Sequence, residues 1–299
     1  MTNEIILSIC IPTYNRAEIL DQTLQKLFSN PEFDNNKVEV IVSNNASKDN
    51  TEEVVSKYPE VKYYKNIDNI GDKNYSLVLG YATGRYLKLF NDTVEFKPQA
   101  LKKIIDIIEK HDEKQNIFFY ANLFTNYNCK KIITSNKELI NEVSYFTTWI
   151  LNFGIWREDF KKIENKDRYT ELQFAHVDWT YKLIKNGKNS IIYFDDLFNV
   201  IIPRKKGGYN IFNTFVNNYL YIIKLEKLPR LDYELEKYRL FKHFIYPWLI
   251  TLLITDIKKF NFDIEGGYKI IFRKYWYTPY FYFFQLLFFI KKLKNEILH

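Results

Sequence analysis

Short apolar runs alternate with amphipathic stretches through the first half of the chain, and this alternation constrains the fold more than any other feature. The apolar runs have the length of strands and span 5–11, 38–43, 61–65 and 86–90. The stretches with helical spacing of apolar residues span 17–28, 47–58, 72–81 and 98–111. Strands that alternate with helices build parallel βαβ units with right-handed crossovers. We therefore expect an α/β fold with a doubly wound, mostly parallel sheet.

From about Ile117 the pattern becomes mixed, and later it changes character altogether. Strand-like runs occur at 116–122, 130–135, 189–194 and 197–203. A helical stretch at 176–187 ends at Gly187. After the glycine pair at 207–208 the chain is aromatic and Lys-rich to its end, and we expect this region to be helical. These changes predict a first domain over 1–203 and a helical, aromatic-rich C-terminal extension over 204–299.

The charge balance limits the partners of this chain. It has 43 Lys and Arg against 36 Asp and Glu, a net charge of +7 and a pI near 9.0. Nucleic acid, an anionic membrane surface and a nucleotide-linked substrate all fit that sign. A Lys-rich surface without any such partner gives the same balance. Because the positive charge is spread along the chain and no nucleic-acid-binding module is recognisable, we expect no nucleic-acid partner.

Cysteine content and hydropathy bear on the compartment. Cys10 and Cys129 are too few for a disulfide framework, and Cys10 falls in an apolar run, as a buried reduced thiol would. The N-terminus has no basic lead and no small-residue cleavage site, so no signal peptide is expected. The apolar runs 244–254 and 279–290 are shorter than the ~20 residues that a membrane-spanning helix needs. We expect a cytoplasmic protein that is soluble or peripheral to a membrane.

Polar residues cluster where three of the predicted strands end. The clusters are Pro12–Arg16, Ser43–Thr51 and Asn91–Thr93. Open α/β sheets bind ligands beyond the carboxyl ends of their strands, and a loop that leads into a helix offers N–H groups to a phosphate. Each cluster alone is more often an ordinary turn. The pattern as a whole favours ligand chemistry at the carboxyl edge of the sheet.

A further feature is Asp178, near the start of the helical stretch 176–187 and next to Trp179. A carboxylate beside an aromatic wall can act as a general base toward a hydroxyl group. The alternative is a first-turn carboxylate that complements the helix dipole. Taken alone, Asp178 fits this alternative better.

Taken together and in order, these segments resemble the family-2 inverting glycosyltransferases of GT-A fold. The segments that carry the resemblance are SICIPTYNR (8–16), IVSNNASKDNT (41–51), NIGDKNYSL (69–77), ATGRYLKLFNDT (82–93) and HVDW (176–179). The resemblance extends from Leu7 to about Pro203, and it is specific as an ordered set. It implies a GT-A, Rossmann-like catalytic domain over 1–203, with a nucleotide-sugar half over about 1–98 and an acceptor half over about 99–203.

The resemblance also implies a nucleotide site and a mechanism. The nucleotide-binding residues would be Pro12, Thr13, Tyr14, Arg16, Asn44, Lys73, Asn91, Asp92 and Thr93. Asp178 would be the catalytic base that deprotonates the acceptor hydroxyl in a single displacement with inversion at the anomeric carbon. Asn44 stands where the family usually has an Asp that contacts uracil, and this difference weakens the inference that the donor carries uracil.

A divalent metal cofactor, Mn²⁺ or Mg²⁺, is implied, with one departure from the family pattern. Asp92 would hold the metal, but Thr93 replaces the second carboxylate. A hydroxyl is a poor substitute for a carboxylate toward a hard cation. Glu95, just beyond, is a weaker candidate ligand because strand alternation can aim it elsewhere.

The alternative to a metal is a leaving diphosphate neutralised by basic side chains. Lys73 is one candidate, and the other is a loop hinged by glycines that closes over the diphosphate. The basic residues of this diphosphate loop are Arg204, Lys205 and Lys206. The same tripeptide fits an ordinary solvated loop equally well.

Aromatic residues of the acceptor half suggest an acceptor-side surface. Trp156, His176 and Trp179 would line it, and Trp149 is a further candidate. An aromatic face can stack on a sugar ring, and a histidine can orient a phosphate. The alternative for each Trp is a place in the core, and a lone His is more often structural. The acceptor would be a saccharide or a lipid-linked saccharide.

The C-terminal region alternates Lys and Arg with aromatic blocks, most clearly over 268–295. Such a segment is typical of an interfacial amphipathic structure, with Tyr and Trp at headgroup depth and Lys toward anionic lipid. A helical subdomain packed on the catalytic domain, or a homo-oligomer, would hide the same surface. We expect a peripheral protein on the inner face of the cytoplasmic membrane.

The sequence as a whole predicts an inverting glycosyltransferase. Its donor would be a nucleotide-diphosphate sugar, with a UDP-sugar favoured, and its acceptor a hydroxyl of a bacterial surface glycan or a lipid-linked saccharide. One alternative is a polyprenyl-phosphate glycosyltransferase, which usually carries a pair of long transmembrane helices that are absent from this sequence. The other is a non-catalytic nucleotide- or saccharide-binding protein that retains the fold.

Overall fold

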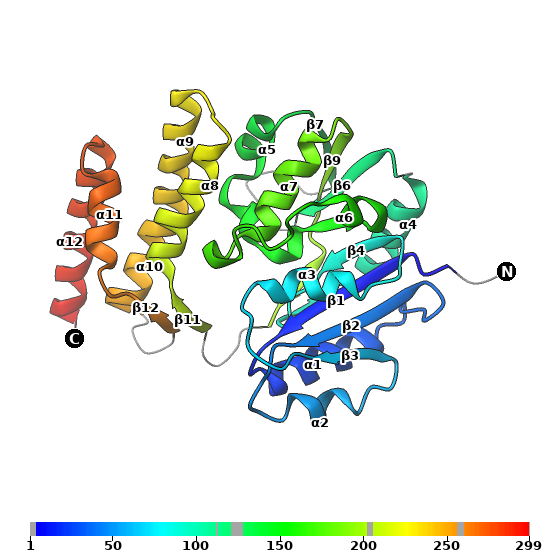
Figure 1. Ribbon diagram of the computed structural model, residues 1–299. Coiled ribbons are helices and arrows are strands. Elements are labelled where there is room, and N and C mark those ends of the chain that lie inside the picture. The colour runs from blue at the N-terminus through cyan, green and yellow to red at the C-terminus, as the bar shows by residue number, and fades with distance from the viewer. Residues whose placement is uncertain (1–3, 112, 121–127, 202–205, 256–259, 299) are drawn as a thin grey trace. The chain divides into compact units, whose positions relative to one another are not determined.

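The computed structural model describes residues 4–111, 113–120, 128–201, 206–255 and 260–298 (Figure 1). The chain divides into two compact units. The first unit comprises Met1–Leu139 and Phe146–Ile202, and the second unit comprises Ile140–Tyr145 and Pro203–His299. Each unit buries apolar side chains of its own.

A five-stranded sheet forms the centre of the first unit. Its strands are β1 (Leu7–Thr13), β2 (Val38–Asn44), β3 (Val61–Lys65), β4 (Tyr86–Leu89) and β8 (Gly154–Trp156). They lie in the order β3-β2-β1-β4-β8, and every neighbouring pair is parallel except β4 with β8. The predicted α/β fold with a mostly parallel sheet is confirmed. The antiparallel strand β8 is an addition to the predicted strands.

Helices cover both faces of this sheet, as a doubly wound fold requires. They are α1 (Ala17–Phe28), α2 (Thr51–Val55), α3 (Lys73–Gly80) and α4 (Ala100–Lys110). The apolar stripes of α1 and α4 join the core on one face, whereas α3 packs against β1, β2 and β4 on the other (Figure 1). All four helices lie within the stretches that were expected to be helical.

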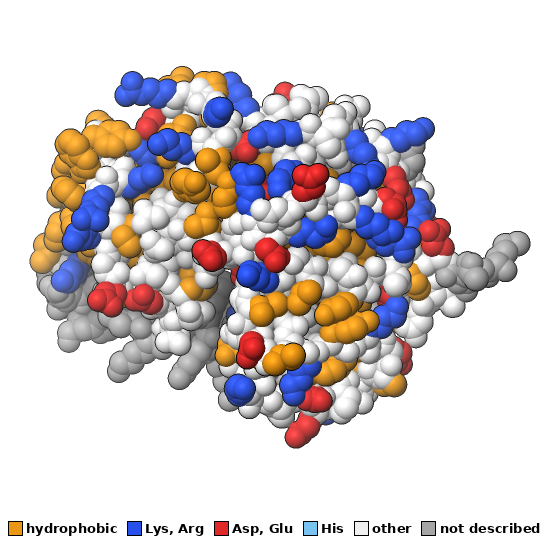
Figure 2. All heavy atoms as spheres, viewed as in Figure 1, with side chains coloured by type: hydrophobic (Ala, Val, Ile, Leu, Met, Phe, Trp, Pro, Cys, Tyr) orange, Lys and Arg blue, Asp and Glu red, His pale blue; other side chains and the backbone are white. Residues whose placement is uncertain are grey.

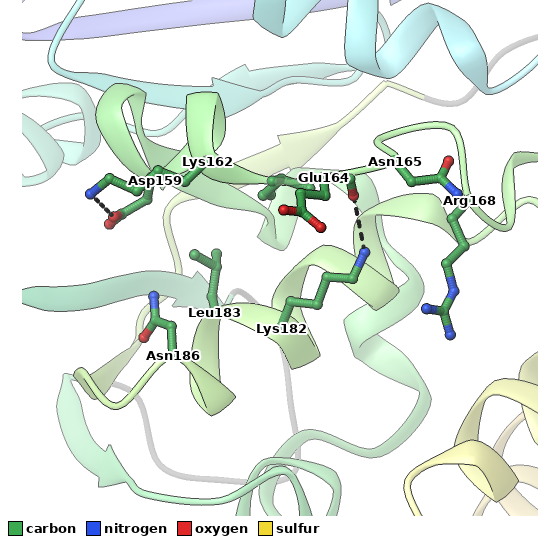
Figure 3. Close-up of a pocket in the computed structure, with 9 residues that line it drawn as sticks. Asp159, Lys162, Glu164, Asn165, Arg168, Lys182, Leu183 and Asn186 are labelled. Carbon is green, nitrogen blue, oxygen red and sulfur yellow. Dashed lines mark hydrogen bonds and ion pairs between the residues drawn. The ribbon is translucent and has the colours of Figure 1, made fainter.

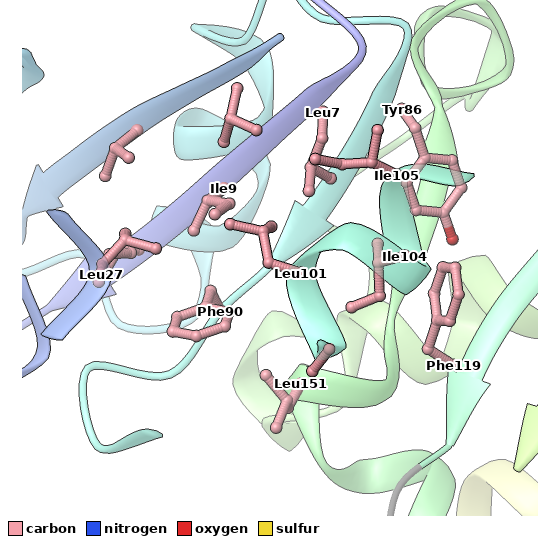
Figure 4. Close-up of a cluster of buried hydrophobic side chains, with 14 of the residues drawn as sticks. Leu7, Ile9, Leu27, Tyr86, Phe90, Leu101, Ile104, Ile105, Phe119 and Leu151 are labelled. Carbon is pink, nitrogen blue, oxygen red and sulfur yellow. The ribbon is translucent and has the colours of Figure 1, made fainter. Parts of the chain in front are cut away.

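The core between β1 and α4 fixes the position of the sheet (Figure 4). Leu7 and Ile9 point from β1 toward the helix, and Leu101 and Ile104 of α4 meet them. All four side chains are fully buried. Burying a side chain of this size contributes about 1.5–3 kcal/mol, so this contact anchors the strand that ends in Thr13.

Lys88 interrupts the apolar character of β4. It is fully buried, and its Nζ donates a hydrogen bond of 2.5 Å to the carbonyl oxygen of Leu151. The ammonium also lies over the rings of Phe119 and Phe198. Burial lowers the pKa of Lys88 to about 7 because the charged form loses its hydration. A substantial fraction of this side chain is therefore neutral at neutral pH.

The rest of this part of the chain adds a second sheet, an antiparallel pair of strands and three helices. The second sheet has the order β6 (Gln115–Tyr120), β9 (Asn189–Phe194), β7 (Cys129–Ile133). The antiparallel pair consists of β5 (Val94–Phe96) and β10 (Phe198–Val200). The helices are α5 (Asn136–Val143), α6 (Arg157–Lys162) and α7 (Ala175–Lys185). Short 3-10 helices lie at Ser144–Thr148, Ile150–Asn152 and Thr170–Leu172.

The second unit is mainly helical, as expected, and it also contains a small sheet. Its α-helices are α8 (Leu220–Leu225), α9 (Arg230–Leu240), α10 (Tyr246–Ile250), α11 (Gly267–Tyr275) and α12 (Pro279–Leu298). π-helical turns adjoin them at Asn213–Tyr219, Phe241–Ile245 and Thr251–Thr255. The sheet is a parallel pair, β11 (Lys206–Asn210) with β12 (Phe260–Asp263). Within the described ranges, none of the helices combines the length and the apolar character needed to cross a bilayer.

A buried carboxyl group lies in the core of the second unit. The Oε1 atom of Glu236 accepts hydrogen bonds from Ser144 Oγ (2.8 Å) and Tyr219 OH (2.7 Å). Burial raises the pKa of Glu236 to about 7, even though both hydrogen bonds favour the charged form. Desolvation therefore dominates the ionisation of this group.

Candidate active site

The loops that follow β1 and β2 are joined by hydrogen bonds. Asn15 N donates to Ser47 Oγ (2.8 Å), and Lys48 N donates to Asn15 Oδ1 (2.7 Å). Asn15 and Ala46 have φ values of 51° and 59°, in the left-handed region that sharp turns use. The polar clusters expected after these two strands therefore lie side by side at the carboxyl edge of the sheet.

The cluster after β4 joins the same edge through Asp92. Thr13 Oγ1 donates to Asp92 Oδ2 (2.8 Å), and Arg16 Nη1 forms an ion pair with Asp92 Oδ1 (2.8 Å). The Asp92 side chain is 3% exposed. Thr23 Oγ1 of α1 donates to the carbonyl oxygen of Asp92 (2.9 Å). The structure thus brings together three of the expected nucleotide-binding residues, from segments more than seventy positions apart.

Other expected nucleotide-binding residues differ in what they offer to a ligand. Asn44 is buried, with Nδ2 donating to Tyr63 OH (2.8 Å) and Oδ1 accepting from Ser47 N (2.8 Å), so its amide holds the loop together. Lys73 is exposed at the first turn of α3. Tyr14 is 40% exposed, and Pro12 beside it is half-buried. Tyr14 and Lys73 therefore remain accessible at this edge, and Asn44 acts inside the protein.

A network of amides supports Lys73, and the sequence interpretation missed it. Asn45 Nδ2 donates to Asn69 Oδ1 (2.8 Å), which ties the Asn-Ile-Gly turn to the end of β2. Asn74 Nδ2 donates to the carbonyl oxygen of Ser43 (2.9 Å), which ties α3 to the same strand. The signal that could have revealed the network is the high density of asparagine between positions 44 and 74.

The residues near Asp92 in the sequence do not provide a second carboxylate beside it. Asn91 is half-buried, and its Oδ1 has no hydrogen-bond partner among the residues that the structure describes. The carbonyl oxygen of Thr93 accepts a hydrogen bond from Ile201 N (2.7 Å). Glu95 lies in β5, where it pairs with Lys26 and accepts from Asn199 Nδ2. Glu95 is therefore directed to α1 and β10 and not to Asp92.

The described residues do not form a ready metal site. No group of three or more His, Cys, Asp or Glu side chains that could hold a metal ion occurs in the described ranges. Asp92 is the one carboxylate of its cluster, and Thr13 and Arg16 occupy both of its oxygens. A hard divalent cation needs several oxygen ligands, so the implied Mn²⁺ or Mg²⁺ does not fit this arrangement as it stands.

Asp178 lies in the first turns of α7, as its sequence position predicted. Its side chain is 11% exposed. Oδ2 forms an ion pair with Lys182 Nζ at 2.9 Å, and Oδ1 lies 3.9 Å from Arg168 Nε. The second distance is longer than a hydrogen bond, which leaves Oδ1 able to accept a proton from a substrate hydroxyl. Lys182, four residues on in a helix, could have been foreseen, whereas Arg168 comes from a loop that carried no signal.

A cavity of about 400 Å³ is lined by charged, amide and apolar side chains of α6, the loop after it and the C-terminal part of α7 (Figure 3). Its lining residues are Asp159, Lys162, Ile163, Glu164, Asn165, Arg168, Lys182, Leu183 and Asn186. Arg168 and Lys182, the two partners of Asp178, both belong to this lining. Lys182 Nζ also donates to the carbonyl oxygen of Glu164 (3.4 Å). The charged and amide groups of the lining can hydrogen-bond the hydroxyls of a ligand, and Asp178 itself is not one of the lining residues.

Helix α3 contacts α7 through an aromatic pair, and it contacts the loop before α7 through a hydrogen bond. The rings of Tyr75 and His176 are 5.9 Å apart, and Ser76 Oγ donates to Asp167 Oδ1 (2.9 Å). The helix that begins at Lys73 therefore lies against the turn that carries Asp178. Burial lowers the pKa of His176 to about 4, although a hydrogen bond between Nε2 and the carbonyl oxygen of Thr148 (2.9 Å) opposes the shift. His176 is thus neutral at neutral pH and fully buried.

The tryptophans that were expected on the acceptor side are located in the core. Trp156 is 1% exposed, and its Nε1 donates to the carbonyl oxygen of Gln115 (2.6 Å). Trp179 is fully buried, and its Nε1 donates to the carbonyl oxygen of Lys166 (3.1 Å). Trp149 is partly buried against the main core. In this structure neither Trp156 nor Trp179 offers a ring face to a saccharide. Trp156 is buried because it belongs to β8, which pairs antiparallel with β4 in the central sheet.

The expected diphosphate loop is only partly covered. Arg204 and Lys205 lie outside the described residues. Lys206 is the first residue of β11, and its side chain is not described. Its role in closing over a diphosphate therefore stays a prediction.

Comparison with known proteins agrees with this architecture. The family model described as Glycosyl transferase family 2 matches residues 8–179. Abequosyltransferase RfbV of Salmonella typhimurium is 36% identical over 91 residues, which is 28% of this chain and 27% of that protein. Chondroitin synthase of Escherichia coli is 29% identical over 191 residues, 61% of this chain and 25% of that protein. The chain spans about a quarter of the length of these two curated relatives.

Solved structures share the fold at low sequence identity. TarS of S. aureus in complex with UDP has a TM-score of 0.55 and 17% identity, covering 85% of this chain and 77% of its own. The mannosyltransferase PcManGT from Pyrobaculum calidifontis, in complex with GDP-Man and Mn²⁺, has a TM-score of 0.56 and 16% identity, covering 82% and 72%. At such identity the likeness establishes the GT-A fold alone.

The family match covers more than half of the chain and includes β1, β4 and the first turns of α7. The chain belongs to glycosyl transferase family 2. The resemblance seen in the sequence is thereby confirmed at the level of family and fold.

Proposed function

We propose that this protein transfers a sugar from a nucleotide-diphosphate donor to a hydroxyl group of a saccharide acceptor. The observation that carries the proposal is the convergence of Thr13, Arg16 and Asp92 beyond the carboxyl ends of β1 and β4. In open α/β sheets this edge is where nucleotides bind. Membership of glycosyl transferase family 2 supports a glycosyl donor in particular.

The donor side has groups suited to a nucleoside diphosphate. The exposed ring of Tyr14 can lie against a base, and the Arg16 guanidinium, with a side chain 41% exposed, can approach a phosphate. Lys73 offers a second cation at the start of α3. Cations at this position stabilise the negative charge that develops on the leaving diphosphate. A UDP-sugar is the favoured donor, in keeping with the UDP found in the TarS complex.

The acceptor side is assigned to Asp178 and the cavity next to it. An acceptor saccharide in the cavity would place one hydroxyl at Asp178 Oδ1, and the carboxylate would take its proton as the oxygen attacks the anomeric carbon. The bond between that carbon and the nucleotide diphosphate breaks on the opposite side, so the configuration inverts. Positioned general bases of this kind contribute roughly 10²–10⁴-fold to rate.

The acceptor class is a surface glycan or a lipid-linked saccharide. Two relatives are named for sugar transfer and polysaccharide synthesis, an abequosyltransferase and a chondroitin synthase. Asn165 and Asn186 in the lining of the cavity can form hydrogen bonds with the hydroxyls of such an acceptor. The identity of the sugar and of the linkage depends on contacts with both substrates.

Calorimetric titration of the full chain with UDP, GDP and CDP, each with and without Mn²⁺, tests the donor assignment. We expect one of these nucleotides to bind at micromolar concentration, and turnover of the matching nucleotide-sugars would then be followed by release of that nucleotide. Binding without turnover of any nucleotide-sugar would favour a non-catalytic nucleotide-binding protein. Failure of all three nucleotides to bind would overturn the proposal.

A further inference from the structure

Helices α11 and α12 form a hairpin in the second unit, and the hairpin has an inner and an outer face (Figure 1). On the inner face, Phe281 and Phe284 of α12 contact Phe241, with ring centroids 6.0 Å and 5.6 Å apart. Phe281 is fully buried by these contacts. Because its inner face is used in this way, α12 can present only its outer face to a partner.

The outer face of α12 is apolar without interruption for three turns. Its residues are Tyr282, Phe283, Leu286, Phe289, Ile290 and Leu293, all at least 42% exposed. At about 100° per residue they occupy a single arc of roughly 120° around the helix. A second apolar arc, besides the one that packs on the core, is more than folding of the unit requires.

Helix α11 extends this surface. Tyr268, Phe272 and Trp276 are spaced four residues apart and are all exposed. Phe272 contacts Phe281 of α12 at 6.0 Å, and Tyr282 OH donates to the carbonyl oxygen of Trp276 (2.6 Å). The hairpin face is defined here as Tyr268 and Phe272 of α11, Trp276 directly after this helix, and the six residues of α12. Figure 2 shows hydrophobic side chains gathered over this hairpin.

From Gly266 to Asn295 the charges of the hairpin all have one sign, and Glu296 follows in the last turn of α12. Between Gly266 and Asn295 the sequence contains no Asp or Glu, and its basic residues are Lys269, Arg273, Lys274, Lys291, Lys292 and Lys294. Lys269 and Arg273 each follow an aromatic residue of the hairpin face and are exposed beside it. Lys294 is exposed next to Leu293 at the far end. A net charge of +7 for the whole chain is thus concentrated largely in this segment.

We propose that the hairpin face binds the surface of an anionic lipid bilayer. Tyr and Trp favour headgroup depth, Phe and Leu reach the acyl boundary, and Lys and Arg next to them attract anionic headgroups. A second copy of the chain is a poorer occupant, because a symmetric contact would bring two sets of six cations together. The proposal goes beyond the glycosyltransferase function and does not depend on it.

Vesicle flotation tests the proposal on the full chain. We expect the protein to float with phosphatidylcholine vesicles that contain phosphatidylglycerol, and to stay unbound with phosphatidylcholine alone. High salt should weaken the binding, because it screens the attraction of the basic residues. Absence of binding to the anionic vesicles at low salt would overturn the proposal.

Two sets of variants separate the contributions of charge and apolar area. Replacing Lys291, Lys292 and Lys294 by Gln should weaken binding roughly a hundredfold, at roughly fivefold for each basic residue. The matched control replaces three exposed lysines of the first unit by Gln: Lys57, Lys102 and Lys110. This control changes net charge equally, and it should keep vesicle binding. Equal loss in both triple variants would show non-specific attraction and overturn the proposal.

The apolar set consists of Phe283→Gln with Phe289→Gln, expected to weaken binding by at least about tenfold. Its control is Leu231→Gln with Leu235→Gln, two exposed apolar residues of α9 outside the hairpin face. Light scattering of the wild type gives the competing outcome. A dimer that the Phe283 and Phe289 changes dissociate, with no vesicle binding, would assign the face to a second copy and overturn the lipid proposal.

A measurement on the wild-type protein covers the case in which a variant does not fold. Trp276 is 53% exposed, whereas Trp156 and Trp179 are fully buried. Brominated anionic lipids should therefore quench part of the tryptophan fluorescence, and Trp276→Phe should remove that part. Quenching that is absent, or that persists in Trp276→Phe, would contradict insertion of the hairpin face.

Discussion

Arg16 Nη1 lies 2.8 Å from Asp92 Oδ1, and Thr13 Oγ1 lies 2.8 Å from the other carboxylate oxygen. In the resemblance to family 2, Asp92 and Thr93 stand where two acidic residues are expected, and the structure shows the remaining carboxylate held by a cation of the protein. The side chain of Asp92 is almost fully buried while that of Arg16 is 41% exposed. This ion pair therefore controls what Asp92 can offer to a donor.

Arg16→Gln should make nucleotide binding depend on Mn²⁺ more strongly than in the wild type. The substitution frees Asp92 Oδ1, and an ionised oxygen with nucleotide phosphates nearby is a ligand set that a divalent cation prefers. Calorimetric titration of UDP with and without Mn²⁺ measures the effect. We expect the wild type to change little and the variant to gain affinity with Mn²⁺ by about tenfold or more, equivalent to ~1.4 kcal/mol.

The matched control for this experiment is Lys26→Gln, which removes one positive charge from α1, the helix that begins directly after Arg16. Lys26 is an exposed residue of α1 whose partner is Glu95, at 3.8 Å. The Lys26→Gln variant should bind UDP with the same Mn²⁺ dependence as the wild type. The same Mn²⁺ response in Arg16→Gln and the wild type would mean that the ion pair does not compete with a metal.

Asp178→Asn should abolish turnover and leave donor binding intact. The amide cannot accept the proton of the acceptor hydroxyl, so kcat should fall by roughly 10²–10⁴-fold. Nucleotide affinity should stay within about twofold, because Asp178 contacts Lys182 and Arg168 and not the Asp92 cluster. Steady-state kinetics and calorimetry on the same preparation provide the two readouts.

Glu171→Gln is a suitable control for the loss of a carboxylate in this region. Glu171 is exposed in the 3-10 helix that precedes α7. The turnover of the Glu171→Gln variant should match that of the wild type. If Asp178→Asn retained full turnover, the assignment of the base would be wrong. If instead it lost nucleotide binding as well, its effect would be structural.

Trp156→Phe should lower stability without changing the KM for the acceptor. The change removes the hydrogen bond from Nε1 to Gln115 O and leaves a gap beside Tyr86, whose ring is 5.2 Å from the indole. We expect the free energy of unfolding, measured with urea, to be lower than that of the wild type by about 1–3 kcal/mol. If the KM for the acceptor rose while stability stayed unchanged, Trp156 would instead have a role in binding the acceptor.

The central sheet was predictable because its information is local. The runs that became β1, β2, β3 and β4 are short and apolar, and parallel pairing follows from the helices between them. The placement of Thr13 and Asp92 at one edge follows from the same topology. The order of helices on the two faces needs no further information, since right-handed crossovers determine it.

What the sequence did not reveal depends on pairings between distant segments. Trp156 lies in β8, which is only three residues long, and a Cβ at Gly154 would collide with the ring of Tyr86. That close approach to β4 places Trp156 in the core. Lys88 occupies the centre of a strand in which a lysine would be expected at the surface. The pairing of Arg16 with Asp92 spans 76 positions, and no periodicity encodes it.

The small sheet of the second unit has the same origin. β11 and β12 are separated by about fifty residues, which are mainly helical where the structure describes them. Their pairing includes an irregular register between Gly207 and Asn210. The sequence of that region is aromatic and has the spacing of helices, so it did not predict these two strands. The exposed residues of the hairpin face, in contrast, follow from the helical spacing of Phe, Leu and Ile in α12.

Glu236→Gln should stabilise the protein at neutral pH and change its pH dependence. The carboxyl has a pKa of about 7 in the folded chain against an ordinary value of 4.5. Between about pH 4.5 and 7 the unfolded chain therefore holds fewer protons at this position than the folded one, so wild-type stability falls as pH rises through this range. Gln keeps the acceptor for Ser144 and Tyr219 but has no charge to desolvate.

The difference in unfolding free energy between Glu236→Gln and the wild type should thus grow from pH 5 to pH 7 and then level off. A shift of this size corresponds to at most about 3 kcal/mol at the upper end. Urea unfolding at several pH values measures it, with Glu265→Gln, an exposed residue of the same unit, as the control that should show no such trend. A pH-independent difference would mean that Glu236 is ionised in the folded protein and that its two hydrogen bonds outweigh its burial.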